Sequence, residues 1–327
     1  MKIILRTIVA LLLLVVLGAA ALLLFFSTPE VPEAVLMAKY GQAPSKFLTL
    51  PSGTRVHYRD YAPTAAASAS YSAAPTLVLL HGSNASLHTW EPWAQRLRDT
   101  MRVVAVDLPG HGLTGATVEA DYSPQGMVEF VENFTRALRL DRPFVLAGNS
   151  MGGHIAWRYT LAHPDRVSRL MLLDAAGVTA PEVKLSPPLA FRLARNPLTA
   201  VLVRHVAPRR LFASALRDAF YDKRLVTPEM VDRYWELNRR KGTPDATLAR
   251  FRLPQDDPAM ARLHEISVPT LVLWGREDAL LPVALAGVYG RNIPHVKVIE
   301  YDHCGHLPME ELADRSAADV GEFVKGN

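Results

Sequence analysis

Six short runs of apolar, often β-branched residues alternate with helical patterns after residue 75, and this alternation limits the possible folds most. The runs occupy residues 76–82, 102–112, 143–150, 167–177, 268–278 and 296–306, and each ends in a polar or glycine-containing turn. Helical patterns separate most of them, at residues 88–99, 124–140, 151–162 and 283–290. Apolar strands separated by helices predict an α/β fold with a mostly parallel sheet that helices cover on both faces. We therefore expect functional residues beyond the carboxyl ends of the strands.

The other segments suggest a division into domains. Residues 46–61 predict two short strands joined at Ser52-Gly53, and the Ser/Ala-rich segment 62–75 predicts an exposed loop. No strand-like run appears between 177 and 252, where amphipathic helical patterns follow one another. Their expected starts are near Ser186, Pro208 and Thr227. We interpret residues 177–260 as a helical cap inserted into an α/β core made of residues 46–176 and 261–327.

The N-terminus carries an uncharged apolar stretch, residues 7–26, preceded by Lys2 and Arg6. Roughly 20 helical residues that rise about 1.5 Å each match a bilayer core of about 30 Å. We expect residues 1–26 to form a transmembrane anchor and residues 27–45 to form a tether. The basic residues before the stretch predict a cytoplasmic N-terminus, with the rest of the chain exported to the periplasm or the cell exterior. A cleaved signal peptide and a buried core helix are the alternatives.

Charge and motif content narrow the possible partners. The formal net charge is +4, yet no Lys/Arg run resembles a nucleic-acid patch, so we expect no nucleic-acid partner. The basic charge is concentrated in residues 177–252, which hold 15 Lys/Arg against 7 Asp/Glu. A solvated face, or contact with anionic lipid headgroups or an acidic substrate, would explain it. No H-E-x-x-H, C-x-x-C or Walker pattern occurs, so the sequence predicts no metal and no cofactor.

The segment Gly148-Asn149-Ser150-Met151-Gly152 matches the G-x-S-x-G pattern between a predicted strand and a predicted helix. A strand that turns abruptly into a helix holds its middle residue in a strained conformation and needs small neighbours. Such a turn exposes the hydroxyl of Ser150 as a candidate nucleophile. Glycines that merely ease an ordinary strand-to-helix turn are the alternative.

A serine hydroxyl needs a base to remove its proton and an acid to orient that base. His306 follows the last predicted strand, and Asp278 follows the strand before it. The resulting chain order of serine, aspartate and histidine is typical of one class of catalytic triad. We therefore predict Ser150 as nucleophile, His306 as base and Asp278 as the acid.

The loop at His81-Gly82 follows the first long strand of the predicted parallel sheet, where a backbone amide can face the nucleophile. We expect the backbone N–H groups of Ser83 and Met151 to form an oxyanion hole, each donor contributing roughly 3 kcal/mol. Asn84 and Trp274 are candidate substrate-binding residues, although Trp274 also suits a core position.

Several other residues could take part in this chemistry. Asp174, at the end of a predicted strand, is the main alternative to Asp278. Alternative bases are His303, His81 and His111, of which His81 also suits a role in shaping the oxyanion loop. His154 lies one helical turn after Ser150, where packing beneath the pocket is the simpler role. The single cysteine, Cys304, cannot form an internal disulfide, and no strand-to-helix turn precedes it to support a nucleophilic role.

Five motifs occur together in one order: HGSNASLHTW, DLPGHG, GNSMGG, LWGREDALLP and CGHLPMEE. On these motifs the chain from about residue 46 to its end resembles the α/β-hydrolase superfamily. The resemblance implies a Ser-His-Asp triad, an oxyanion hole of backbone amides and a variable helical cap over the substrate pocket. It does not imply a substrate, because the fold hosts many chemistries. A serine nucleophile argues against epoxide hydrolases and dehalogenases, which use an aspartate there.

These observations lead to three functional hypotheses. The first is a membrane-anchored carboxylesterase or lipase-like enzyme that cleaves a small-molecule acyl ester or lipid-like substrate through an acyl-enzyme on Ser150. The second is a C–C bond hydrolase of ring-cleavage products, because the segment GNSMGG is similar to that of some such enzymes. The third is a fold without catalytic activity that serves as a binding module.

Overall fold

An eight-stranded sheet organises the computed structural model, which describes residues 2–61, 74–181, 183, 189–254 and 257–326. The strand order is β1-β2-β4-β3-β5-β6-β7-β8, and every pairing from β4 to β8 is parallel. The strands of this parallel part are β3 (Thr76–Leu80), β4 (Arg102–Val106), β5 (Phe144–Asn149), β6 (Val167–Leu173), β7 (Thr270–Gly275) and β8 (Val296–Tyr301). The predicted mostly parallel sheet is therefore confirmed, and each strand falls within its apolar run.

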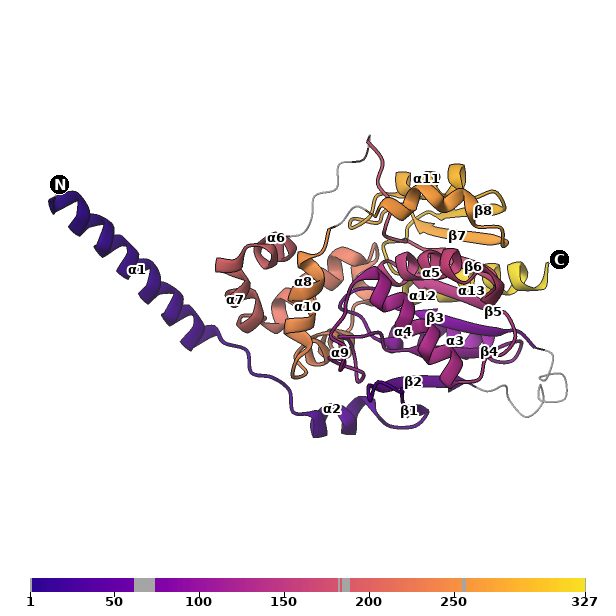
Figure 1. Ribbon diagram of the computed structural model, residues 1–327, viewed down its shortest axis with the longest axis horizontal. Coiled ribbons are helices and arrows are strands. Elements are labelled where there is room, and N and C mark those ends of the chain that lie inside the picture. Colours follow the sequence, from indigo (N-terminus) through magenta and orange to yellow (C-terminus); the bar gives the residue numbers. More distant parts are fainter. Residues whose placement is uncertain (1, 62–73, 182, 184–188, 255–256, 327) are drawn as a thin grey trace.

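Two hydrophobic clusters cover the two faces of this sheet. Along β3, Val78 and Leu80 join one cluster, whereas Leu77 and Leu79 join the other, because successive side chains point to opposite faces. The first cluster includes residues of α4 (Pro124–Ala137), α5 (Met151–Ala162) and α11 (Ala286–Asn292), and the second includes residues of α3 (Glu91–Leu97) and α13 (Ala313–Lys325). Figure 1 shows these helices beside the strands. The layers hold the strand ends rigidly, which positions the loops that follow them.

The predicted hairpin is present at the edge of the sheet. Strand β1, Ser45–Thr49, pairs antiparallel with β2, Arg55–Tyr61, and Gly53 in the turn adopts a φ of 90°. Strand β2 also pairs antiparallel with β4. Most of the predicted loop 62–75 lies outside the described residues.

In the described part of the long interval between β6 and β7 lie five α-helices, inside the range 177–260 that we interpret as a cap. Two of them begin where the sequence predicts: Pro208 precedes the first residue of α8, and the Thr227 side chain caps α9 by accepting from Met230 N. The predicted start at Ser186 lies outside the described residues. The helices are α6 (Leu189–Arg195), α7 (Pro197–His205), α8 (Arg209–Ala219), α9 (Pro228–Asn238) and α10 (Thr243–Arg252).

Helix α1, Lys2–Phe26, covers the predicted membrane anchor and extends away from the rest of the molecule (Figure 1). Within the described part of the chain, no helix has the length and apolar content that crossing a membrane requires. The structure therefore does not support the predicted transmembrane helix over residues 7–26. The predicted single-pass topology with an exported domain loses its support with it.

The predicted tether, residues 27–45, contains a helix and docks on the cap. Helix α2, Glu33–Tyr40, buries Leu36 completely in a cluster with Leu113 and Leu237. Upstream of α2, Thr28 N donates to His205 O at 2.7 Å, and the Arg239 guanidinium donates to Thr28 O. The segment is thus packed rather than extended, because apolar and backbone groups find partners on the cap.

The other short helices among the described residues lie in connections and near the C-terminus. They are α12 (Pro308–Glu311) and the 3-10 helices Leu87–Trp90, Pro164–Arg166, Lys223–Leu225, Pro258–Glu265 and Val283–Leu285.

Candidate active site

Ser150 occupies the sharp turn between β5 and α5, as the motif predicts. Its φ of 53° and ψ of −117° lie in a region that non-glycine residues rarely adopt. A Cβ on Gly148 would lie 2.2 Å from Gly152 O, and a Cβ on Gly152 would lie 2.1 Å from Leu80 O. Both positions therefore require glycine, because larger residues would collide with backbone. The surrounding backbone imposes the strained conformation of Ser150, and a constraint of this kind is typical of functional sites.

His306 and Asp278 form a close pair on neighbouring loops that follow β8 and β7. His306 Nδ1 lies 2.6 Å from Asp278 Oδ2, and both side chains are buried. Asp278 Oδ1 also accepts from Leu280 N at 2.7 Å and from Leu281 N at 3.0 Å. These bonds fix the carboxylate, so Nδ1–H of His306 donates to it and Nε2 is left to accept a proton.

Asn149 connects the loop of His306 to the turn that carries Ser150. Its side-chain amide donates to His306 O at 3.0 Å and to Leu173 O at 3.2 Å. Among the described residues no hydrogen bond joins Ser150 Oγ to the His306 ring, so their direct contact stays a prediction. The sequence alone assigns Asn149 no catalytic or binding role. Its position inside the motif, directly before the serine, was the available signal.

The loop after β3 lies against the same turn. His81 Nε2 accepts from Leu108 N at 3.1 Å, so its Nδ1–H donates to Gly82 O at 2.7 Å. This arrangement agrees with the expected role of His81 in shaping the loop. A Cβ on Gly82 would lie 3.2 Å from Cβ of Ser150, which places the loop beside the candidate nucleophile.

The other predicted oxyanion and substrate residues occupy distinct positions. Met151 is the first residue of α5, and Ser83 directly follows Gly82; their donation to an oxyanion stays a prediction. Asn84 has a φ of 61°, and its carbonyl accepts from Asn238 Nδ2 of the cap at 2.6 Å. Trp274 is completely buried in the core, where its Nε1–H donates to Leu281 O, an arrangement that favours a structural role.

The alternative bases have other partners in this structure. His303 is exposed and packs against the Tyr221 ring, with 5.2 Å between ring centroids. His111 is buried with Nδ1 bonded to Pro109 O. His154 pairs with Asp257, with 2.5 Å between Nε2 and Oδ2. None of these contacts joins the histidine ring to the Ser150 side chain.

Cys304 and Asp174 are both buried close to the His306–Asp278 pair. Burial and the neighbouring carboxylates raise the pKa of the Cys304 thiol, which disfavours the nucleophilic thiolate. Asp174 forms no hydrogen bond with His306, so Asp278 is the acid that contacts the imidazole. Within the described residues, Asp174, Asp278 and His306 are also the one group with ligand atoms close enough to hold a metal ion.

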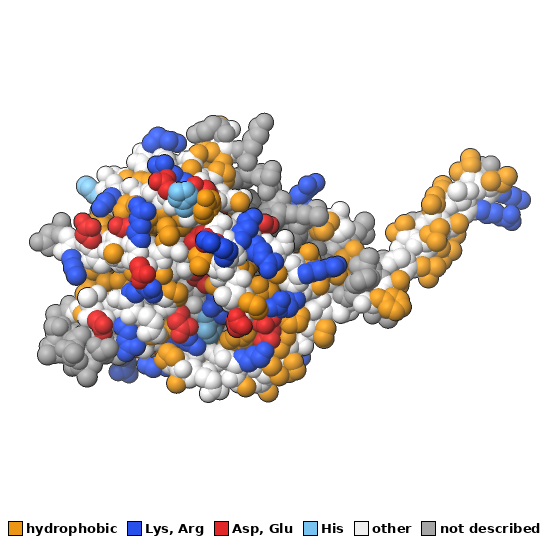
Figure 2. All heavy atoms as spheres, turned by 180° about the vertical axis from the view of Figure 1, so that it is seen from behind, with side chains coloured by type: hydrophobic (Ala, Val, Ile, Leu, Met, Phe, Trp, Pro, Cys, Tyr) orange, Lys and Arg blue, Asp and Glu red, His pale blue; other side chains and the backbone are white. Residues whose placement is uncertain are grey.

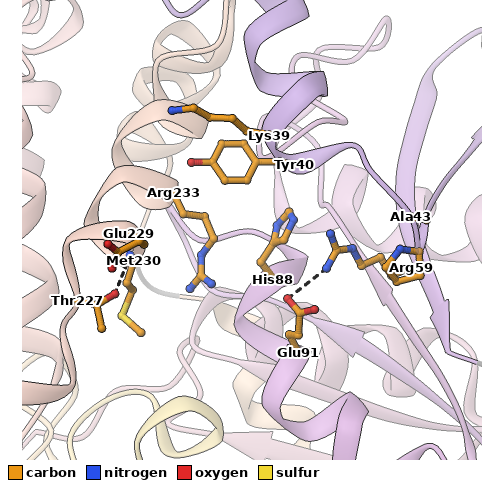
Figure 3. A pocket seen from close by; sticks show the side chains of 11 residues that line it. Lys39, Tyr40, Ala43, Arg59, His88, Glu91, Thr227, Glu229, Met230 and Arg233 are labelled. Atoms are coloured by element: carbon orange, nitrogen blue, oxygen red, sulfur yellow. Dashed lines mark hydrogen bonds and ion pairs between the residues drawn. The ribbon is translucent and has the colours of Figure 1, made fainter.

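A separate charged pocket of about 410 Å³ lies between α2, α3 and α9 (Figure 3). Arg59 pairs with Glu91 across it, and Arg233 pairs with Glu310 nearby. No residue of the candidate triad lines this pocket, so we do not assign it to the candidate chemistry. It is lined by Lys39, Tyr40, Ala43, Pro44, Arg59, His88, Glu91, Thr227, Glu229, Met230 and Arg233.

Known proteins share this fold and sequence pattern. The 2-hydroxymuconate semialdehyde hydrolase of Pseudomonas sp. (strain CF600) is 30% identical over 258 residues, which cover 76% of this chain and 86% of that protein. The monoacylglycerol lipase ABHD6 of Mus musculus is 27% identical over 261 residues, with 76% and 75% covered. A solved structure described as a membrane phospholipase A and bacterial virulence factor has a TM-score of 0.72 and 30% identity, covering 100% of this chain and 99% of that one.

A family model of the alpha/beta hydrolase fold matches residues 75–312, well over half of the chain. The match includes the strained serine turn, the loop after β3 and the His306–Asp278 pair. This protein therefore belongs to the α/β-hydrolase family.

Proposed function

We propose that this protein is a serine hydrolase that cleaves an acyl ester through an acyl-enzyme on Ser150. The observation that carries the proposal is the strained turn of Ser150, which Asn149 ties to the loop of the His306–Asp278 pair. The proposed nucleophile, base and orienting acid follow the carboxyl ends of three strands, β5, β8 and β7.

The proposed reaction begins when Ser150 Oγ attacks the ester carbonyl carbon. His306 Nε2 takes the hydroxyl proton, and Asp278 stabilises the imidazolium that forms. The tetrahedral intermediate then collapses: the bond to the leaving alcohol breaks, and His306 returns the proton to the alcohol oxygen. Water attacks the acyl-enzyme by the same route, which releases the acid and restores Ser150.

The negative oxygen of the tetrahedral intermediate needs hydrogen-bond donors. We propose the backbone N–H groups of Ser83 and Met151, because Gly82 approaches Ser150 closely and Met151 begins α5. The N-terminus of a helix carries partial positive charge, so its first amide suits an oxyanion.

We propose a lipid-like ester as substrate and association of the enzyme with membranes. Relatives named as a monoacylglycerol lipase and a membrane phospholipase support this choice. Exposed apolar side chains along α1 also support it, and Figure 2 shows them on the projecting helix. Apolar surface of this extent is costly in water and favours a lipid or protein partner.

C–C bond hydrolysis is the second candidate. It rests on the 30% identity to a 2-hydroxymuconate semialdehyde hydrolase, whose name indicates a substrate other than an ester. A ring-cleavage substrate that loses its colour faster than any ester is hydrolysed would favour this candidate.

Substitution of the nucleophile tests the proposal. We expect Ser150→Ala to lower hydrolysis of p-nitrophenyl esters at least about 10⁴-fold and to abolish labelling by a fluorophosphonate probe. His306→Gln should have a similar effect, because the base is lost. Esters of graded chain length and a ring-cleavage product would be assayed side by side.

The matched controls are Ser52→Ala and His303→Gln. Ser52 lies in the hairpin turn, and His303 is an exposed histidine three residues before the proposed base. Both should keep full activity. Persistent labelling of the Ser150→Ala protein would exclude Ser150 as the nucleophile. A wild-type protein that binds a ligand but never turns over would instead support the non-catalytic binding module.

A further inference from the structure

A second buried carboxyl group, that of Asp174, lies beside the His306–Asp278 pair. It directly follows β6 and is completely buried. One carboxyl oxygen of Asp174, one carboxyl oxygen of Asp278 and one ring nitrogen of His306 all lie within 4.8 Å of one another. The proposed mechanism uses only one of these two carboxyl groups, so the state of the other requires an explanation.

The backbone holds the Asp174 side chain in place. Its φ of 41° is unusual for a residue other than glycine, and Asp174 N donates to Leu273 O at 3.0 Å. Oδ1 accepts from Gly275 N at 2.9 Å. Oδ2 is buried and accepts from no donor among the described residues. An ionised carboxylate with an unpaired, buried oxygen is costly, whereas a protonated oxygen could donate instead.

The two aspartates differ in the number of donors that face them. Asp278 accepts hydrogen bonds from Leu280 N, Leu281 N and the His306 ring. Asp174 receives only Gly275 N.

The other charged groups near Asp174 do not offset this difference. Glu311, on α12, adds negative charge, and burial and the charge of Asp278 raise the pKa of Asp174 well above its ordinary value. Two buried carboxyl groups whose oxygens lie within 4.8 Å of each other do not both ionise readily.

We propose that Asp174 is a neutral carboxylic acid whose Oδ2–H donates to Asp278, so that Asp174 is a positioning residue for the triad. This inference rests on the proposed function. The donated bond satisfies the unpaired oxygen and holds the Asp278 carboxylate against His306. It also leaves a single negative charge beside the imidazole, which matches the single positive charge that develops there.

Two substitutions at Asp174 test the inference on ester hydrolysis. Asp174→Asn keeps an oxygen for Gly275 N and an N–H donor for Asp278, and it changes no charge if Asp174 is neutral. We expect kcat within about threefold of wild type and an unchanged acidic limb of kcat/KM against pH. Asp174→Leu has a similar size but donates nothing, so kcat should fall about tenfold or more with little change in KM.

The pH profile separates this role from a merely structural one. If Asp174 were ionised, Asp174→Asn would remove a negative charge, lower the pKa of the base and move the acidic limb to lower pH. That shift would overturn the proposal. Wild-type kcat in the Asp174→Leu protein would overturn it as well.

Infrared spectroscopy provides a readout that does not depend on activity. At about pH 8, where ordinary carboxyl groups are ionised, the wild-type protein and the Ser150→Ala protein should both show the carbonyl band of a protonated carboxylic acid. The band should disappear in Asp174→Asn. Its absence from the wild-type spectrum refutes the inference whether or not the variants fold, whereas loss of the proposed function alone would leave the band in place.

Discussion

Asp107 is a buried carboxylate that organises the loops beside the candidate nucleophile. It accepts from Leu87 N and Leu113 N, both at 2.7 Å, and from His57 Nδ1 at 2.6 Å. Burial alone would raise the pKa of Asp107, but attraction and hydrogen bonding by His57 hold it well below its ordinary value. A carboxyl group with a lowered pKa in the folded state stabilises the fold above its unfolded pKa of about 3.9. That stabilisation is lost as the pH falls from about 3.9 toward the lowered pKa of the folded state.

We therefore expect Asp107→Asn to lower the free energy of unfolding by about 3 kcal/mol at neutral pH. The difference from wild type should begin to shrink below about pH 4, because the carboxyl group takes up a proton there in the unfolded wild-type protein while it stays ionised in the folded one. Urea unfolding at several pH values measures this difference. Asp302→Asn, at an exposed ion pair with Arg276, is the control and should change little. A difference that stays constant with pH would contradict the explanation.

At the scale of single residues, the sequence predicted what local backbone geometry determines. Gly148 and Gly152 are required by contacts with the turn itself and with the adjacent strand β3, so the motif alone identified them. The bond from Asn149 to His306 O joins residues 157 positions apart, and no local pattern signals it. The position at a strand end singles out Asp174, but its closeness to Asp278 depends on the pairing of β6 with β7, which no local pattern indicates.

Within the cap, helix α10 carries a buried arginine with few partners. Arg250 is 7% exposed, and its Nε and Nη1 atoms are buried without a hydrogen-bond acceptor among the described residues. Its Nη2 donates to Thr247 Oγ1 at 3.1 Å. Burial lowers the pKa of Arg250 from 12.5 to about 9, because a charged guanidinium without a counter-ion is poorly stabilised away from water.

We expect Arg250→Met to raise the free energy of unfolding by about 1–3 kcal/mol, because an apolar side chain of similar length removes an uncompensated buried charge. Chemical denaturation at pH 7 measures the change. Arg252→Met, two residues later and exposed, should stay within about 0.5 kcal/mol of wild type. A large destabilisation by Arg250→Met would instead reveal a stabilising anion or water network around the guanidinium.

At the scale of elements, the long apolar runs predict the strands, but each strand ends before its run does. The run 102–112 ends as a strand at Val106, because Asp107 turns inward to bond backbone amides. Helix α2 was not predicted, because its stability depends on burial of Leu36 against distant residues of the core and the cap. Tertiary packing, rather than local preference, decides such short helices.

For the molecule as a whole, the distribution of exposed apolar and basic side chains determines what the surface can bind. Leu13 and Val16 on α1 are 56% and 61% exposed. We expect full-length protein to float with phosphatidylcholine vesicles in a density gradient. Leu13→Asp together with Val16→Asp should reduce the bound fraction severalfold, because charged groups are costly in an apolar lipid environment.

Val118→Asp is the matched control, because Val118 is 70% exposed on a core loop and its substitution should leave vesicle binding unchanged. Vesicles with anionic phospholipid should bind more protein at low salt if the basic charge of residues 177–252 contacts headgroups. Equal flotation of the wild-type protein and the double variant would contradict a role of α1 in lipid binding.

The whole fold was more predictable than the surroundings of the site. The order of strands and helices restricts the chain to few topologies, so the position of the candidate residues at one end of the sheet followed from the sequence. The sequence did not predict that residues 27–45 dock on the cap. This docking depends on contacts such as Thr28 with His205 and Arg239, which no sequence spacing indicates.

The burial of Cys304 has a practical consequence for studying motion in solution. Because the chain contains no other cysteine and this thiol is enclosed, maleimide dyes should find no reactive native site. A cysteine introduced at exposed Leu211 on α8 would then carry a fluorophore uniquely. Such a label would report whether the helices between β6 and β7 move during turnover, and no native residue would have to be removed first.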